Sequence, residues 1–446
     1  MKANVRLASV FFILIFPITA LSQTTLNFPL PVDAASGSQV GYALVNPNRA
    51  PAIVSFKTYD ELGTETGSTS VTIPAGGQVS RLFSELFTNT TTNGWVQATS
   101  SASGLQGFTL GGDFVNNVDG VASAAAAVDQ VFPLMGNTTA IVATNPTSYQ
   151  IALTMKLFTA GGSEIAAFGF TLPGRGMVIK PLLDLPFFGA EYADARYVRI
   201  TGSDAFAATA LVAQYLISKP EFALYNGIDV SKTGAVLNFP HVVSGDLDGI
   251  TYETAIALTN LSNADQTVTV TFTPESGFGS RSIQVFLTAG ATIREPVAFP
   301  GSGFQNGWLQ VRSGGPIAGV MVVVNAGARG AGIAVVQPQT TSSTEMVFSH
   351  IANVAPWSTG LAFVNTTQTT ATIELVAVNP NGTEIGRASL TLNPGAKIAR
   401  LLTELVPQSQ ASNGGFVSVR TTGTPVFALE LFSLRSGGPV ANVPAQ

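Results

Sequence analysis

Hydrophobic and polar residues alternate along most of this 446-residue chain, in short runs rich in Val, Thr, Ile and Phe. "YALVNP" at 42–47 and "GWLQVR" at 307–312 are examples. Alternation with a period of two places every second side chain on the same face of a strand. Gly, Pro and Asn separate the runs, as they do at tight turns. The pattern therefore predicts β-strands joined by turns along almost the whole chain.

The runs follow one order of landmarks that recurs four times. Each copy begins at a Phe and continues with a strand ending in Asn, a second strand and turn, a Pro-Gly-type turn, an aromatic-led strand and a strongly apolar strand. The opening residues are Phe28, Phe132, Phe239 and Phe348, at spacings of 104, 107 and 109. Residues 72–87, "TIPAGGQVSRLFSELF", match residues 391–406, "TLNPGAKIARLLTELV", almost position by position. Tandem duplication explains this recurrence.

A repeat of about 105 residues with short strands and regular turns is typical of a two-sheet sandwich. Five or six strands are visible in each repeat, and seven are expected. We predict an all-β chain of four tandem immunoglobulin-like β-sandwich domains, each with one short helical turn, after an N-terminal signal peptide. The predicted boundaries are 1–22 for the signal peptide and 28–131, 132–238, 239–347 and 348–446 for the domains.

The helical turn is predicted after the Gly turn, where a basic and an acidic residue stand four apart. The pairs are Arg81 with Glu85, Lys180 with Asp184, and Arg400 with Glu404. This spacing places both members on one face of a helix. Such exposed pairs stabilise a fold only slightly, so they indicate geometry and no chemistry.

The combined pattern resembles repeats of uncharacterised secreted bacterial proteins. It includes the Phe-Pro start, the strand ending in Val-Asn-Pro, the Tyr-Asp-x-x-Gly turn at 59–63, and the Pro-Gly turn followed by Leu-x-Glu-Leu. The resemblance covers nearly all of the chain after the first residues, and the third repeat departs from it most. It implies an immunoglobulin-like β-sandwich in a secreted or surface module. It implies no catalytic residues.

The first residues have the pattern of a secretory signal peptide. Lys2 and Arg6 precede an apolar run from 7 to 18, and small residues at 20 and 22 predict cleavage before Gln23. We find no second stretch with the length and hydropathy of a membrane span. The expected location is therefore outside the cell or on the cell surface, in a bacterium.

Composition narrows the possible partners. Charged residues are 11% of the chain and the formal net charge is −5, so there is no electrostatic reason to bind nucleic acid. Cysteine is absent, which excludes disulfides, thiolate metal sites and cysteine nucleophiles.

The chain shows no pattern typical of an active site, and we predict no enzyme, no cofactor and no metal. His241 and His350 occupy the same place in the third and fourth repeats, where the first two have Leu30 and Leu134. One His per repeat, with no fixed carboxylate beside it, makes neither a catalytic triad nor a zinc site. Both are interpreted as strand residues.

The aromatic-led strands begin with Trp95, Tyr197, Trp308 and Phe416. Each ring shares a strand face with polar residues, while the apolar positions between them face the core. One hypothesis is that the ring packs under the Gly turn or against the next repeat. The other is a stacking platform for sugar rings, which makes these four residues candidate ligand contacts. We favour packing, because the Phe and Tyr variants suit burial as well as they suit stacking.

These observations predict a secreted or cell-surface, non-enzymatic β-sandwich array that acts as a structural spacer, matrix or adhesion protein. The alternative is a protein that binds carbohydrate or another polymer through the repeated aromatic residues. Extracellular polysaccharide or other surface proteins are the expected partners, and self-association stays open. The connections between repeats lack Gly/Ser-rich linkers, so neighbouring repeats are expected to contact each other.

Overall fold

The computed structural model describes residues 23–31, 39–88, 94–136, 138–182, 194–213, 222–275, 279–297 and 303–446. The predicted signal peptide lies outside these residues. The described chain consists of β-strands in several sheets, and its helices are short. This confirms the prediction of an all-β class.

The first group of strands forms two four-stranded antiparallel sheets, ordered β1-β6-β3-β4 and β5-β2-β7-β8. We call this group unit 1. Its strands are β1 (Thr24–Phe28), β2 (Gln39–Val45), β3 (Ala52–Tyr59), β4 (Glu65–Ile73), β5 (Gln78–Leu82), β6 (Trp95–Ser100), β7 (Gln106–Gly112) and β8 (Val118–Ala122).

The last group, unit 4, repeats this pairing as β24-β29-β26-β27 and β28-β25-β30-β31. Its strands are β24 (Glu345–Phe348), β25 (Trp357–Val364), β26 (Ala371–Val378), β27 (Glu384–Leu392), β28 (Lys397–Leu401), β29 (Phe416–Thr421), β30 (Phe427–Leu434) and β31 (Val440–Val443). The two ends of the chain therefore fold in the same way.

The middle groups have the same order, but one long strand runs from the first sheet into the second. In unit 2, β14 pairs with β9 and β11 at one end and with β10 and β15 at the other. In unit 3, β22 does the same with β17 and β19, and then with β18 and β23.

Unit 2 comprises β9 (Ala127–Phe132), β10 (Thr138–Thr144), β11 (Ile151–Phe158), β12 (Glu164–Leu172), β13 (Met177–Pro181), β14 (Tyr197–Ala213), β15 (Phe222–Asn226) and β16 (Ile228–Asp229). Unit 3 comprises β17 (Gly234–Leu247), β18 (Ile250–Asn260), β19 (Gln266–Pro274), β20 (Arg281–Leu287), β21 (Thr292–Pro296), β22 (Gln305–Gly327) and β23 (Gly330–Val336).

Alternation along the strands decides which side chains enter each core. In β3, Val54 and Phe56 are buried, whereas Ile53 between Ala52 and Val54 is 67% exposed. The landmark Phe residues that open the repeats are all fully buried: Phe28, Phe132, Phe239 and Phe348. Each lies within or at the end of its unit's first strand, so the strands begin before the boundaries drawn at these residues. Eight strand positions recur in all four units, one more than the sequence predicts, and unit 2 has the short β16 in addition.

The landmark Asn at the end of the second strand is a buried clamp. Asn46 donates from Nδ2 to the carbonyls of Ala50 (2.9 Å) and Pro74 (3.0 Å), and its Oδ1 accepts from the Asn48 amide (3.1 Å). The corresponding residues of the other units make the same kinds of bond: Asn145, Asn260 and Asn365. Because a buried amide needs partners for both of its ends, the clamp fixes the Gly turn against the end of the second strand.

The helical turn predicted for each repeat forms in units 1 and 4, but the predicted pairing of Arg81 with Glu85 and of Arg400 with Glu404 does not. Units 1 and 4 contain α1 (Phe83–Leu86) and α2 (Leu402–Leu405). Arg81 lies on β5, before the helix begins, so helical spacing does not apply to it. The Glu85 carboxylate instead accepts the Leu82 amide (2.8 Å) as a cap of the short helix, and Glu404 does the same for Leu401 (3.0 Å). Asp184 lies outside the described residues.

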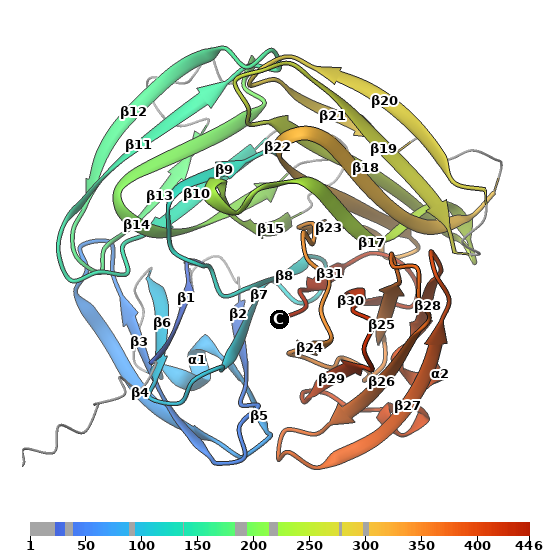
Figure 1. The fold of residues 1–446 in the computed structure, drawn as a ribbon. Helices are drawn as coiled ribbons and strands as arrows, with labels where there is room; N and C mark the ends of the chain where they lie inside the picture. Colours follow the sequence, from blue (N-terminus) through green and yellow to red (C-terminus); the bar gives the residue numbers. More distant parts are fainter. Residues whose placement is uncertain are drawn as a thin grey trace, which may run out of the picture.

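The four units form a closed ring, with unit 4 beside unit 1 and the C-terminus near the centre (Figure 1). One strand from each unit, β8, β15, β23 or β31, lies at the axis of the ring, and these four strands contact one another. Direct hydrogen bonds join the C-terminal residue to unit 1, since the Gln446 side chain accepts from the Gly107 amide (2.9 Å) and donates to the Gly107 carbonyl (3.0 Å). The prediction that neighbouring repeats touch is confirmed, and contact extends from the last unit back to the first.

A buried carboxylate, Asp119 on β8, joins all four units at the axis. It accepts the amides of Gly120 (2.8 Å), Leu224 (2.8 Å), Asn442 (3.1 Å) and Val335 (3.5 Å). The strand registers show that these four amides occupy the same position in the four units. Where unit 1 has Asp119, the other units have alanine: Ala223, Ala334 and Ala441. Burial raises the pKa of Asp119 to about 8, and the amide hydrogen bonds oppose this rise.

We expect Asp119→Ala to lower the free energy of unfolding by more than about 3 kcal/mol, because each buried amide left without a partner costs about 1–3 kcal/mol. Urea denaturation measures this. Glu345→Ala is the control, since it removes an exposed carboxylate paired with Arg420 (2.7 Å) and should cost less than about 1 kcal/mol. Equal effects of the two substitutions would contradict a structural role for Asp119.

Candidate functional site

Every junction between neighbouring units contains the same backbone hydrogen bond. The first amide of the fifth strand of one unit donates to a carbonyl in the hairpin between the third and fourth strands of the preceding unit. The four bonds join Met177 to Glu61 (3.2 Å), Thr292 to Ala160 (2.8 Å), Lys397 to Glu275 (3.5 Å) and Gln78 to Pro380 (2.9 Å). The last of these links unit 1 to unit 4, so the contact that joins units along the chain also closes the ring.

The aromatic residues singled out from the sequence lie at these junctions. The Trp95 indole donates to the Arg175 carbonyl (2.8 Å), the Tyr197 hydroxyl to Gly290 (3.0 Å), and the Trp308 indole to Gly395 (3.3 Å). All three acceptors occupy the same position of the next unit's Gly turn. That position has a left-handed backbone in every unit, with φ of 59° at Gly76, 63° at Arg175, 73° at Gly290 and 71° at Gly395.

Two members of this set depart from the common pattern. Phe416 has no donor and packs instead with Val45 of unit 1 and Val378 of its own unit. Arg175 replaces glycine at the left-handed position, and its side chain reaches back to unit 1. Its guanidinium donates to the Gln97 side chain (2.9 Å) and lies 5.9 Å from the centre of the Tyr59 ring.

All four rings are buried, with exposed fractions of 0% for Trp95, 4% for Tyr197, 7% for Trp308 and 5% for Phe416. Trp95, Trp308 and Phe416 pack against the second strand of the next unit, and Tyr197 contacts its Gly turn. Their faces are therefore not open to a stacked sugar in this structure. The contacts are those of the packing hypothesis.

We expect Trp95→Ala to lower the free energy of unfolding by about 3–5 kcal/mol, because it leaves a cavity between units 1 and 2 and an unpaired carbonyl at Arg175. Phe286→Ala is the matched control. Phe286 is 64% exposed on β20, so its loss should change stability by no more than about 0.5 kcal/mol. Urea denaturation monitored by circular dichroism compares the two, and equal midpoints would contradict the interface role of Trp95.

Two corresponding clefts lie between units. The first has a volume of about 490 Å³ and lies between units 4 and 1. The second has a volume of about 460 Å³ and lies between units 3 and 4. In each, the second sheet of one unit forms one wall, and the other wall belongs to the preceding unit. His350 lines the first cleft and His241 the second.

The two clefts share small residues on the second and fifth strands. Gly41 and Gly360 hold the same register position, opposite Leu82 and Leu401, whereas units 2 and 3 have alanine there: Ala140 and Ala255. Two residues earlier on the fifth strand the four units have Ser80, Ile179, Arg294 and Ala399. The units with clefts therefore have the smaller side chains at both positions.

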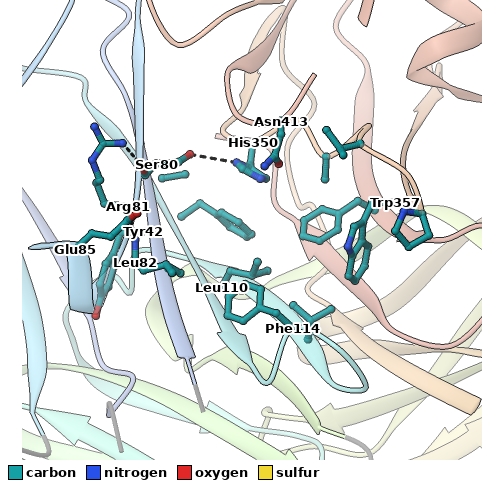
Figure 2. A pocket seen from close by; sticks show the side chains of 18 of the residues that line it. Tyr42, Ser80, Arg81, Leu82, Glu85, Leu110, Phe114, His350, Trp357 and Asn413 are labelled. Atoms are coloured by element: carbon teal, nitrogen blue, oxygen red, sulfur yellow. Dashed lines mark hydrogen bonds between the residues drawn. The ribbon is translucent and has the colours of Figure 1, made fainter. Parts of the chain in front are cut away.

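The cleft between units 4 and 1 is apolar in its depth and charged at its mouth. Figure 2 shows His350 facing Ser80 across the cleft, and the Ser80 hydroxyl lies 3.3 Å from His350 Nδ1. Trp357 and Phe432 make an edge-to-face pair with ring centres 5.5 Å apart. Arg81 is exposed, and its guanidinium donates to the Ser80 carbonyl (2.8 Å).

The cleft between units 3 and 4 adjoins a polar network that sequence reasoning missed. Lys397 is 3% exposed, and its Nζ lies 2.8 Å from His241 Nδ1, donates to the Gly307 carbonyl (2.7 Å) and bonds Asn306 Oδ1. The Glu275 carboxylate accepts hydrogen bonds from the side-chain amide of Asn306 (2.6 Å) and from the Arg400 guanidinium (3.1 Å). Only the basic residue within an otherwise uncharged "NPGAKI" turn could have signalled this site in the sequence.

Burial keeps the cleft histidines neutral at physiological pH. It lowers the pKa of His350 to about 4. It lowers the pKa of His241 well below the ordinary value, and the neighbouring Lys397 adds to this. Burial also lowers the pKa of Lys397 to about 7, although Glu275 opposes the shift. Ser80 and His350 have no carboxylate as a third member among the described residues, so they do not form a catalytic triad.

Lys397→Gln should flatten the pH dependence of stability between about pH 7 and 10.5. The folded pKa of Lys397 lies below the ordinary 10.5, so the unfolded chain holds an extra proton in this window and the free energy of unfolding rises with pH. Unit 1 has Gln78 at the same register position, where it bonds the Ser349 carbonyl (3.1 Å), so glutamine suits this place. Urea denaturation at pH 7, 8.5 and 10 measures the effect.

Lys232→Gln is the control for this prediction, because Lys232 has a side chain that is 71% exposed. It should leave the pH profile of the parent chain unchanged. A Lys397→Gln profile as steep as that of the parent would contradict a depressed pKa for Lys397.

The described residues contain no group of three or more His, Cys, Asp or Glu side chains able to hold a metal ion. In the same part of the chain, no helix combines the length and the apolar character that a membrane crossing requires.

Comparisons with known proteins give little. No protein-family model and no curated protein matches the chain. Among solved structures, Thermotoga maritima 1070 aligns with 24% of this chain and 95% of its own, at a TM-score of 0.21 and 11% identity. A GH78 family rhamnosidase of Bacillus sp. GL1 aligns with 94% of this chain and 54% of its own chain, at a TM-score of 0.15 and 8% identity. A glycoside hydrolase family 32 structure from Bifidobacterium adolescentis aligns with 94% of this chain and 99% of its own chain, at a TM-score of 0.15 and 10% identity. These scores carry no argument about function.

Proposed function

We propose that this chain is a secreted, non-enzymatic protein of four immunoglobulin-like β-sandwich domains that acts in adhesion or in an extracellular matrix. One observation carries the proposal. The features that recur in every repeat are used in building the ring, as buried aromatic residues, Gly turns and Asn clamps. Catalytic groups would have to come from outside the repeated pattern.

The closed ring favours adhesion or a matrix role over a linear spacer. A spacer gains length with each added domain, whereas here the hydrogen bond from Gln78 to Pro380 brings the last unit back to the first. A ring held by buried contacts at every junction presents its outer surfaces in a fixed arrangement. Such rigidity favours binding to extended polymers or surfaces, because little conformational freedom is lost on binding.

Expression of the full chain in a bacterium tests the proposal. The chain should reach the cell exterior, and its mass should correspond to a start at Gln23. Incubation with glycoside, ester and peptide substrates should yield no product. Retention in the cytoplasm with an intact N-terminus would contradict secretion. A non-enzymatic role would be contradicted if the chain turned over one of these substrates and a single substitution, such as Glu275→Gln, abolished that turnover.

A further inference from the structure

The two clefts and the two histidines of the chain occur together. His350 and His241 line the only clefts described above, whereas at the other two junctions the same place is occupied by Leu30 and Leu134. Gly41 lines the first of these clefts and Gly360 the second, at the same register position. Three features therefore coincide at these two junctions: a cleft, a glycine in its wall and an imidazole.

Each cleft has an aromatic wall. In the first, Trp357 and Phe432 cross edge-to-face at 76°. In the second, Tyr252 and Phe304 cross at 65° with ring centres 5.7 Å apart. Both pairs belong to the unit that also supplies the histidine. Volumes of about 490 and 460 Å³ fall within the range of clefts that hold drug-sized molecules.

The charges stand at the mouths of the clefts. Arg81 and Glu85 are exposed, and the Glu85 carboxylate already caps the following helix. Arg400 and Glu404 are placed in the same way in the second cleft, where Arg400 pairs with Glu275 (3.1 Å). In the first cleft, a charged group of a ligand placed away from Arg81 and Glu85 would therefore lose its hydration without gaining an oppositely charged partner.

The histidines are among the polar groups that line the clefts. His350 Nδ1 faces the Ser80 hydroxyl, and within the described chain no hydrogen bond engages its Nε2. His241 likewise uses Nδ1 toward Lys397. The depressed pKa values of both rings leave one nitrogen able to accept and the other to donate. A neutral imidazole of this kind matches a hydroxyl group, which can do both.

We infer that the two clefts are corresponding binding sites for a small, largely apolar ring compound with one hydroxyl group, its ring lying against the aromatic wall and its hydroxyl bonding the histidine. The glycines leave room for the ring, since a Cβ at Gly41 would come no closer than 3.7 Å to any neighbour, and at Gly360 also 3.7 Å. This site goes beyond the proposed adhesion role and does not depend on it.

Titration of the full chain with 2-naphthol, followed by calorimetry, tests the inference. Two sites per chain are expected, with dissociation constants on the order of 0.1–1 mM for a ligand of this size. Gly41→Val and Gly360→Val should each remove one site, and the double variant should remove both. Gly169→Val is the control, because a Cβ there meets nothing within 4 Å and Gly169 lies outside the clefts. It should retain both sites.

The role of the histidine is tested in the Gly360→Val background, where only the first cleft is left. His350→Leu uses the residue that units 1 and 2 already have at this place, so the fold should be kept. It should weaken 2-naphthol binding roughly three- to tenfold, the value of one hydrogen bond. In the same Gly360→Val background, the anion 2-naphthoate should bind at least about tenfold more weakly than 2-naphthol.

Three results would overturn the inference. They are the absence of 2-naphthol binding to the parent chain, two sites retained by a folded Gly41→Val and Gly360→Val double variant, and 2-naphthoate binding as tight as that of 2-naphthol. Circular dichroism and thermal melting of each variant separate loss of a site from loss of the fold. A His350→Leu chain with unchanged affinity would remove the hydroxyl contact and with it the stated ligand class.

Discussion

Ring closure in this protein depends on one head-to-tail contact between neighbouring units. Each unit inserts the aromatic residue of its sixth strand under the Gly turn of the next unit and receives that unit's first fifth-strand amide on its hairpin. Because the two surfaces differ, repeating the contact gives either a closed ring or an open helix. The angle at this contact closes the ring after four units. The Gln78 amide on the Pro380 carbonyl (2.9 Å) is therefore the same contact that joins units within the chain.

Closure brings one strand of each unit to a common axis, where one amide of each strand donates to the Asp119 carboxylate. Four donors cannot satisfy each other, so an acceptor is needed that no symmetric repeat provides. Asp119 meets this need from a single unit, while the other units keep alanine and leave space for its side chain. The carboxylate is buried at the cost of a raised pKa, and the amides offset part of that cost. One substitution in one repeat thus serves all four.

The junctions share their hydrogen bonds but differ in what lies beside them. Large side chains at 179 and 294 stand where Ser80 and Ala399 leave the clefts open. The four units therefore share the contact that builds the ring and differ in the residues around it. The sequence shows the two histidines and their common place in the repeat, but it does not show that each faces the second sheet of the following unit. Lys397 and Glu275 were not expected at all, because they meet only across a junction.

The sequence by itself determined the all-β class, the alternation that buries Val54 and exposes Ile53, the recurrence of the landmarks, and the strand face on which the four aromatic residues lie. These are local properties, set by a period of two and by turn residues. Only the tertiary structure decided that the repeats close on themselves, that the rings are covered by the next unit, that Arg81 and Glu85 do not pair, and that Asp119 lies on an axis. Each of these depends on the angle between neighbouring units. That angle follows from how two surfaces pack, and no pattern within one repeat encodes it separately.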